Sequence, residues 1–485
     1  MYESAVPSRV SVRRVSVLLA LLFALPALAA AVSATSSGAA APPDRNTVPA
    51  VSSSAAVTAL DLDFVATKNG EPVIDLRREE IVLEVNGKKV AIDFFSRPGE
   101  SSPANAVETP EPARPIVEAK GAGRDLLVFV DELHLQPADR KRALAAVRSL
   151  VSRVPPGDRL SLVVCAEAAR TIVPFTSDPA EVLAGLAEVE ARPDPAGLRW
   201  YNRERSVQAD LQGDKSIYLR PDAGRVLAQR RATLMAWTSE LFARDEAFLQ
   251  ELSRTVSAVA SRPGGKVLLF LSSGFELLPG DTLRKSYLGS SDSLPPSLLP
   301  GMQDLLRKAN QSGITFHAVH ASGLEARAEV DATIRGSVGF VDKDGNAFSG
   351  PALSASPVDE IARTAGARQP LATLAVETGG FFVGNRNDLG SAVETTLEMA
   401  RKSYSVGVTL PGAPPAGGSF SVKVSVKRPG VNVFARRSWS ARTADELAKD
   451  RVEAALLDPR AASDFDVKLG VEEASAEKPR EVPFA

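Results

Sequence analysis

The chain holds 485 residues, of which 44% are hydrophobic and 24% are charged, and its formal net charge is -2. Because domains typically hold about 100 to 200 residues, this length allows two or three domains with a large core and excludes a small disulfide-held scaffold. The balanced charge gives no field strong enough to make nucleic acid the main partner.

The first 35 residues have the pattern of a secretory signal peptide. Arg13 and Arg14 precede an apolar run from Val15 to Leu28, where Ala27-Leu28-Ala29 has the form that signal peptidase accepts. The run is shorter than the roughly 20 residues that a spanning helix needs, and no later stretch reaches that length. We therefore expect a secreted or periplasmic protein, with no integral membrane segment after signal cleavage.

Two low-complexity segments flank a short stretch of strands. Residues 36–56 are rich in Ala, Ser and Pro and predict a flexible tether. Residues 57–97 alternate in polarity and carry two Asn-Gly dipeptides, which are typical of tight hairpins, so they predict an N-terminal β module. The Pro-rich residues 98–123 predict a linker.

Residues 124–403 alternate between strand and helix patterns, which predicts a parallel sheet covered by helices. The stretch Arg124–Leu135, RDLLVFVDELHL, carries an apolar run that ends at Asp131. Such a run is typical of a strand buried on both faces, and ligand sites of doubly wound sheets lie at the carboxyl ends of strands. Further strands are predicted at Arg159–Ala166, Thr171–Phe175 (antiparallel), Lys266–Leu271, Ile314–His320 and Phe381–Val383.

Three segments interrupt this alternation and are interpreted as insertions: 192–230, 279–301 and 322–368. The first is rich in arginine, which favours an acidic partner surface. The other two follow strand ends, where binding loops are concentrated in such folds, and unstructured decoration is the equal alternative. A short helix is predicted after them, at Leu371–Glu377.

Alternating polarity returns in residues 404–440. We expect these strands to pair with the N-terminal module in one small β-sandwich, because each piece alone is too small to bury a face. The tail, 441–485, predicts a helix and one further strand at Phe465–Leu469. The only cysteine, Cys165, lies in an apolar strand, which indicates a buried thiol and excludes an intrachain disulfide.

The order of PPGDRLSLVV, PFTSD, KVLLFLSSGF, ITFHAVH, LAVETGG and YSVGVTLP after the Asp131 strand resembles the von Willebrand factor type A domain. More narrowly, it is similar to a branch of secreted bacterial proteins related to that domain and frequent in Acidobacteria. The resemblance covers residues 57 to 440. It implies an α/β fold with a doubly wound, mostly parallel, Rossmann-like sheet, and binding of a protein or cell-surface ligand as the function.

Proteins of that family typically hold Mg²⁺ at a metal-ion-dependent adhesion site, through Asp-x-Ser-x-Ser, a Thr and a second Asp. Asp131 matches the first ligand here, but Leu133 and Leu135 stand at the serine positions and Ser273 stands where the second Asp belongs. Leucines cannot supply the oxygen ligands of an octahedral cation. We therefore expect a degenerate site with no metal and no cofactor, and we keep as the alternative a Mg²⁺ held weakly by Asp131, Glu132 and a serine.

The predicted binding rim consists of side chains at strand ends: Asp131, Glu132, His134, Ser272 and Ser273. The simpler interpretation of the two acids is a solvated strand end whose carboxylate accepts backbone N–H groups of the next turn, and that of His134 is a surface residue. His317 and His320 lie three apart on a strand and so face opposite sides, which prevents them from holding one metal together.

We expect no catalytic residue. The alternative is a hydrolase that uses Ser273, or Asp131 and Glu132, with a histidine, although no glycine precedes Ser272-Ser273-Gly274 in the way a nucleophile elbow requires. A second alternative is a structural scaffold within an envelope assembly.

Overall fold

The computed structural model describes residues 57–99, 123–193, 195–212, 222–262, 265–288, 296–322, 339–341, 347–349, 357–384, 386, 388–411, 419–440 and 443–457. The predicted signal peptide, the whole tether, nearly all of the linker, and the predicted strand at Phe465–Leu469 lie outside these residues. No helix in the described part of the chain is both long and apolar enough to cross a membrane.

Six strands within the described residues form the central sheet. They are β6 (Asp125–Asp131), β7 (Arg159–Cys165), β8 (Ala169–Thr176), β9 (Lys266–Ser272), β10 (Ile314–His320) and β13 (Phe382–Val383). Their order is β13-β10-β9-β6-β7-β8, and all neighbours pair in parallel except β7 with β8. All seven residues of β6 are buried, because β6 lies between β9 and β7 and helices cover both faces.

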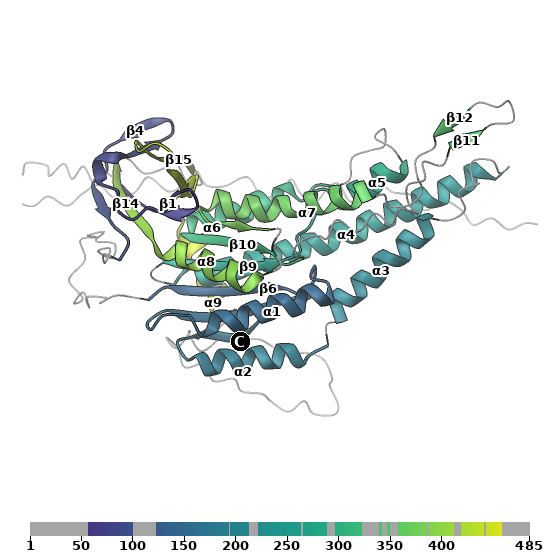
Figure 1. Cartoon of the computed structure of the whole chain (residues 1–485), viewed down its shortest axis with the longest axis horizontal. Helices are drawn as coiled ribbons and strands as arrows, with labels where there is room; N and C mark the ends of the chain where they lie inside the picture. Colours follow the sequence, from purple (N-terminus) through teal and green to yellow (C-terminus); the bar gives the residue numbers. More distant parts are fainter. Residues whose placement is uncertain are drawn as a thin grey trace, which may run out of the picture. The chain divides into compact units, whose positions relative to one another are not determined.

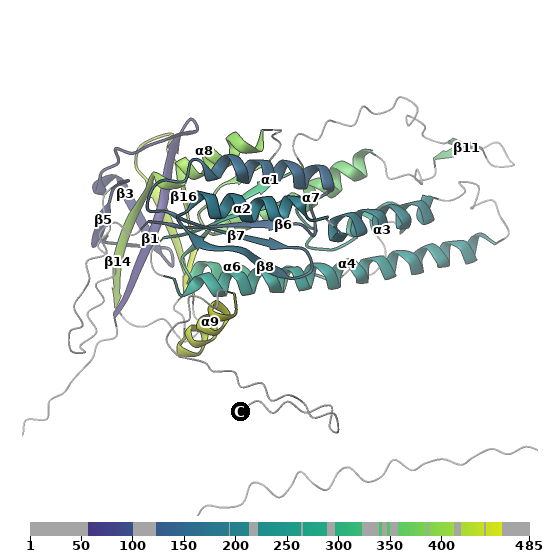
Figure 2. The same ribbon diagram turned by 90° about the horizontal axis from the view of Figure 1, so that it is seen from below.

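The alternation of side chains along β6 assigns helices to the two faces of the sheet. Leu126, Val128 and Val130 belong to one apolar cluster, and Leu127 and Phe129 belong to the other. The first cluster contains α1 (Pro137–Val151), α2 (Pro179–Ala191) and α8 (Leu389–Arg401). The second contains α4 (Ala223–Ala260), α6 (Leu299–Gln311) and α7 (Pro357–Glu377). Figure 2 shows α1, α2 and α8 on one side of the strands and α4 and α6 on the other.

Strands from the beginning and the end of the described chain form two further sheets around one apolar core. The first holds β1 (Val57–Lys68), β2 (Glu71–Pro72), β5 (Phe94–Ser96), β14 (Ser403–Pro411) and β16 (Asn432–Ala435). The second holds β3 (Ile81–Val85), β4 (Lys88–Val90), β15 (Ser419–Val426) and β17 (Ser438–Ser440). Figure 1 shows purple N-terminal strands interleaved with yellow-green C-terminal strands.

Tight turns and long-range pairing fix the register of these sheets. Asn69 and Asn86 have φ angles of 55° and 50°, and each precedes a glycine that also has positive φ, as two-residue type I′ hairpins require. Strand β1 pairs antiparallel with β14 along nine residues, from Val57 opposite Pro411 to Val65 opposite Ser403.

Two further helices lie towards the two ends of the described chain. A short 3-10 helix, η1 (Arg78–Glu80), precedes β3, and α9 (Ala444–Leu457) packs on α4.

The three predicted insertions contain more regular structure than their composition indicated. Helix α3 (Pro195–Gln212) and the start of α4 occupy the first, and α5 (Asp281–Leu288) and the start of α6 occupy the second. The third contains a hairpin of β11 (Gly339–Val341) and β12 (Ala347–Ser349) and the first part of α7. The arginine-rich segment is helical because Val207 and Leu211 pack against Leu234 and Trp237 of α4.

The predicted short helix at Leu371–Glu377 is wrong in its start. Helix α7 begins at Pro357, inside the predicted insertion, and passes through Pro370. Its later part is fixed by Leu371, Leu374 and Ala375, all buried in the core, and the helix also packs against α5.

Candidate functional site

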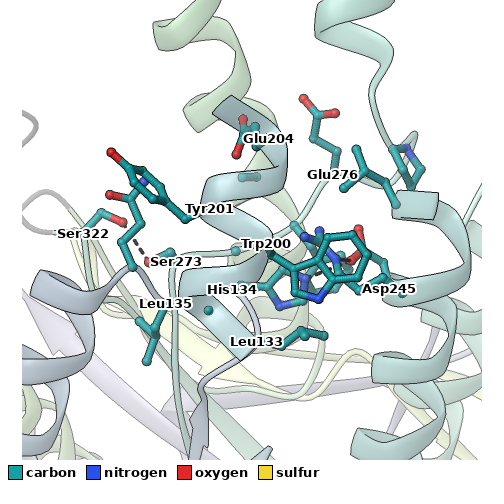
Figure 3. Close-up of a pocket in the computed structure, with 18 of the residues that line it drawn as sticks. Leu133, His134, Leu135, Trp200, Tyr201, Glu204, Asp245, Ser273, Glu276 and Ser322 are labelled. Carbon is teal, nitrogen blue, oxygen red and sulfur yellow. Dashed lines mark hydrogen bonds and ion pairs between the residues drawn. The ribbon is translucent and has the colours of Figure 1, made fainter. Parts of the chain in front are cut away.

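A pocket of about 320 Å³ lies at the carboxyl ends of β6, β9 and β10 (Figure 3). These ends meet because the three strands are parallel neighbours in the sheet. The turn after β6 contributes His134, the loop after β9 contributes Ser273, and the end of β10 contributes His320. Helices α3 and α4 form a wall through Trp200 and Trp237.

His134 is held between two carboxylates in the floor of this pocket. Its Nδ1 lies 2.8 Å from Asp131 Oδ2, and its Nε2 lies 2.9 Å from Asp245 Oδ1 on α4. Asp131 also accepts the backbone N–H of His134 at 3.2 Å. Arg244 Nε donates to Asp245 at 2.5 Å, so α4 brings a second cation to the same group.

These contacts determine the charge of His134. Carboxylates only accept hydrogen bonds, so both ring nitrogens must carry a proton to bond with both acids, which describes an imidazolium. Burial opposes this charge, but Asp131 and Asp245 outweigh it and raise the pKa of His134 above its ordinary value. For Asp245, burial acts to raise the pKa, but Arg244 and His134 hold it below its usual range.

The interpretation of Asp131 as a solvated strand end and of His134 as a surface residue is wrong. Asp131 is 0% exposed and the side chain of His134 is 4% exposed. The reason is α4, whose residue Asp245 covers the strand end and supplies the second acid. The expected bond from the backbone of the next turn to Asp131 does form, but inside the protein.

Leu133 and Leu135, which follow Asp131 at the positions of the missing serines, are core residues. Leu133 packs with the α4 and α7 side of the sheet, and Leu135 packs with the α1 side. Both side chains are buried and apolar, so neither supplies an oxygen ligand for a metal ion at the floor of the pocket.

The two serines of the rim both bond to carboxylates. Ser272 Oγ donates to Asp131 Oδ2 at 2.6 Å and accepts the N–H of Gly274 at 2.8 Å. Ser273 Oγ donates to Asp139 Oδ2 at 3.1 Å and lies 2.9 Å from Ser322 Oγ. Among the described residues, no histidine nitrogen bonds to the hydroxyl of Ser273.

Gly274 shapes the turn that carries these serines. Its φ is +83°, and a Cβ there would lie 2.1 Å from the carbonyl oxygen of Ala367 on α7. Only glycine therefore fits both the left-handed backbone and the close approach of α7. The turn places Ser272 towards Asp131 and Ser273 towards Asp139.

Of the predicted rim residues, His134 and Ser273 line the pocket, Asp131 and Ser272 are fully buried and bond to each other, and Glu132 lies elsewhere. Its Oε1 accepts from Arg140 Nε at 2.6 Å, and Arg140 also donates to the carbonyl oxygen of Val189 on α2. Glu132 therefore takes part in the packing of α1 against α2, because consecutive residues after a strand point in opposite directions.

The aromatic wall of the pocket was not predicted from the sequence. Gly197, Trp200, Tyr201 and Glu204 recur at helical spacing and line the pocket from α3. Trp200 lies 6.0 Å from Trp237 between ring centroids. The signal was present as apolar and aromatic residues three or four apart, but the surrounding arginines concealed it.

His317 and His320 lie in different surroundings, as their spacing predicts. His317 Nδ1 accepts the backbone N–H of Phe381 at 3.1 Å, and burial together with Arg124 lowers its pKa to about 3. His320 lines the pocket, and burial, together with Arg368, lowers its pKa to about 4. Neither ring nitrogen of His320 has a hydrogen-bond partner among the described residues.

Within the described ranges, no group of three or more His, Cys, Asp or Glu side chains is arranged to hold a metal ion. Cys165 is a free, buried thiol at the end of β7, and burial raises its pKa.

No protein-family model matches the chain, and no curated protein matches it in sequence. Among solved structures, it is similar to an aerotolerance-related membrane protein from Bacteroides fragilis at 15% identity and a TM-score of 0.26, covering 58% of this chain and 100% of that one. BatB, a conserved hypothetical protein from Bacteroides thetaiotaomicron, matches at 15% identity and a TM-score of 0.25, over 57% and 100% of the two chains. The PilB minor pilin from Streptococcus sanguinis matches at 11% identity and a TM-score of 0.28, over 70% and 78%.

Proposed function

We propose that this chain is a secreted or periplasmic, non-enzymatic binding module of the von Willebrand type A kind. Its ligand, a protein or a cell-surface molecule, binds at the pocket beyond β6, β9 and β10. The order of motifs along the chain and the position of Asp131 at the end of the central strand support this assignment.

We further propose that binding does not depend on a metal ion. The supporting observation is that Asp131, the residue at the position of the family's first metal ligand, already bonds to His134 and Ser272. The imidazolium supplies the positive charge that a divalent cation supplies in the family, and the buried Leu133 and Leu135 supply no ligand oxygen.

The contacts of the two serines support a non-enzymatic function. A serine nucleophile needs a base within hydrogen-bond reach, at about 2.6 to 3.2 Å. Ser272 and Ser273 donate to carboxylates, and these two acids are themselves bonded to His134 and Arg142. This arrangement holds the serines in place and leaves no basic nitrogen bonded to either hydroxyl.

Calorimetry with Mg²⁺, Mn²⁺ and Ca²⁺ tests metal independence. We expect no cation to bind more tightly than about 1 mM, the weak end of natural calcium sites. Asp131→Asn keeps the shape of the side chain, and Asp304→Asn, on the half-exposed Asp304 of α6, controls for non-specific binding. Affinity tighter than about 1 mM that Asp131→Asn removes and Asp304→Asn preserves would overturn the proposal.

A further inference from the structure

Two buried side chains that line the pocket have polar atoms without partners among the described residues. They are Trp237 Nε1 and both ring nitrogens of His320. The two residues are only 2% and 1% exposed. Because buried polar groups nearly always have hydrogen-bond partners, unpaired groups beside a cavity indicate where a bound molecule supplies them.

The charged side chains of the lining already have partners of their own. Asp245 bonds to His134 and Arg244, and Asp139 bonds to Arg142 and to two serines. Glu276 accepts from Gly280 N at 2.9 Å and Thr282 Oγ1 at 2.7 Å. The polar atoms that lack hydrogen-bond partners therefore belong to neutral side chains. A neutral ligand can bond to them without bringing an unpaired charge into a buried site.

The unmet groups require both a donor and an acceptor from the ligand. An indole N–H only donates, whereas a neutral imidazole offers one donor and one acceptor. The low pKa of His320, about 4, keeps its ring neutral at physiological pH. Hydroxyl groups match this pattern because each can donate one hydrogen bond and accept two.

The pocket also offers a flat apolar surface and little room for an extended chain. Trp200 and Tyr201 are both partly exposed on α3, and Trp200 lies beside Trp237. The volume of about 320 Å³ is at the small end of ligand pockets, which span about 300 to 1,000 Å³. Strands β6, β9 and β10 are each paired on both sides, so a peptide finds no open edge here to extend the sheet.

We propose that this pocket binds a neutral sugar residue, free or at the end of a glycan. The apolar face of the sugar ring packs against Trp200, and its hydroxyls bond to Trp237 Nε1 and to His320. This inference rests on the proposed binding function and specifies the ligand class for the same site.

Tryptophan fluorescence of the full-length chain provides the test. Two of the three tryptophans line the pocket, and the third, Trp439, stacks on Phe420 in the sandwich. The chain is titrated in EDTA with N-acetylglucosamine, galactose and cellobiose, then with glucosamine, glucuronate and N-acetyl-alanyl-alanine amide. We expect at least one neutral sugar to bind with a Kd below about 10 mM, and both charged sugars to bind at least about tenfold more weakly than it.

Matched variants connect the signal to the unpaired groups. Trp237→Phe keeps an aromatic ring without the N–H and is expected to weaken sugar binding about tenfold, the value of one hydrogen bond. His320→Leu is expected to do the same, and His320→Gln, which restores a donor and an acceptor, to recover most of the affinity. Trp439→Phe leaves the pocket intact and is expected to leave the Kd unchanged. Circular dichroism verifies that each variant is folded.

The inference fails if no neutral sugar binds, if the blocked dipeptide binds more tightly than every sugar, or if Trp237→Phe and Trp439→Phe have equal affinity. A repeat with Mg²⁺ separates it from the proposed function. Sugar binding that appears only with Mg²⁺ and is lost in Trp237→Phe supports the ligand class and overturns metal independence. Absence of sugar binding in a chain that also binds no cation overturns the ligand class alone.

Discussion

His134 Nε2 lies 2.9 Å from Asp245 Oδ1, although the two residues are 111 positions apart in the sequence. The other ring nitrogen bonds to Asp131 at the end of β6, so one imidazolium connects the central strand to the middle of α4. Helix α4 also carries Trp237, and this connection therefore fixes a wall of the pocket to its floor. The ring of Phe248, 4.8 Å from His134 between centroids, shields the connection from water.

Asp245→Asn is expected to destabilise the chain by about 3 kcal/mol. The change leaves Arg244 without its acid and His134 with one carboxylate in a buried site, and removing one partner of a buried pair typically costs about 3 to 5 kcal/mol. The measurement is urea unfolding followed by circular dichroism.

Glu240→Gln, on the same helix, is the matched control for that variant. Glu240 pairs with Arg203 at 2.7 Å on the surface, where ion pairs contribute about 0 to 1 kcal/mol. We expect the control to unfold within about 1 kcal/mol of the parent chain. Equal losses in the two variants would show that the His134 contact is worth no more than a surface pair.

The stability of the fold is expected to decrease on the acid side of pH 6.5. The pKa values of His317 and His320 are lowered to about 3 and about 4 from their ordinary 6.5, so the unfolded chain takes up protons that the folded chain refuses. The stability that both contribute is present above pH 6.5 and is lost as the pH falls towards 4. For His320 alone the loss is about 3 kcal/mol. Urea unfolding between pH 7.5 and 4 measures it.

His320→Gln isolates one histidine in that profile. Glutamine does not titrate, so the variant is expected to lose stability less steeply than the parent between pH 6.5 and 4. Parallel profiles for parent and variant would contradict this assignment. His134 acts on the other side, since its raised pKa means that its contribution is complete below pH 6.5 and is lost as the pH rises through its folded pKa.

The strands of the central sheet were predictable, whereas the chemistry at their ends was not. The run from Leu126 to Val130 predicts a buried strand, because a strand covered on both faces has apolar side chains at consecutive positions. The environment of His134 depends on Asp245, and no local pattern connects two residues that far apart. Trp200 was missed for a related reason. Its helix buries an apolar face against distant residues of α4 and α5, and its exposed arginines resemble a loop composition.

Arg436→Met is expected to destabilise the chain by about 1 to 3 kcal/mol at pH 8, the usual penalty for a buried acceptor left unsatisfied. Arg436 is buried between the sandwich strands and α6, where its Nη1 donates to the carbonyl oxygen of Asn310 at 3.2 Å. Burial and Asp63 raise the pKa of Asp61 to about 6, and Arg436 opposes this rise. Removing the guanidinium takes a nearby cation away from Asp61, which is exposed, and leaves the buried carbonyl oxygen of Asn310 without this donor. Urea unfolding at pH 8 and at pH 4.5 measures the change.

The pH dependence of that loss follows from Asp61. A carboxyl whose folded pKa is raised stabilises the fold most at low pH and loses stability as the pH rises from its ordinary 3.8 through the folded value. The penalty of Arg436→Met is therefore expected to be smaller at pH 4.5 than at pH 8. Arg437→Met is the control, because Arg437 is exposed and pairs with Glu377 at 2.9 Å on the surface. A penalty that does not change with pH would exclude Asp61 as its cause.

Tyr404→Phe is expected to cost about 1 to 3 kcal/mol, the usual penalty for a buried group left unsatisfied. The Tyr404 hydroxyl donates to the carbonyl oxygen of Val73 at 2.9 Å and accepts the N–H of Leu76 at 3.0 Å. It thereby holds the segment before η1 against β14, which follows 328 residues later. The ring itself stays packed against Phe64 at 5.1 Å between centroids, so phenylalanine preserves the core and removes only the two hydrogen bonds. Hydrogen exchange is the sharper measurement, because the Leu76 amide loses its partner and is expected to exchange faster. Amides of β1 are expected to lose only the protection that corresponds to the decrease in the free energy of global unfolding. An unchanged Leu76 rate would mean that the segment is held by packing of Leu76, which is fully buried, and not by the tyrosine hydroxyl.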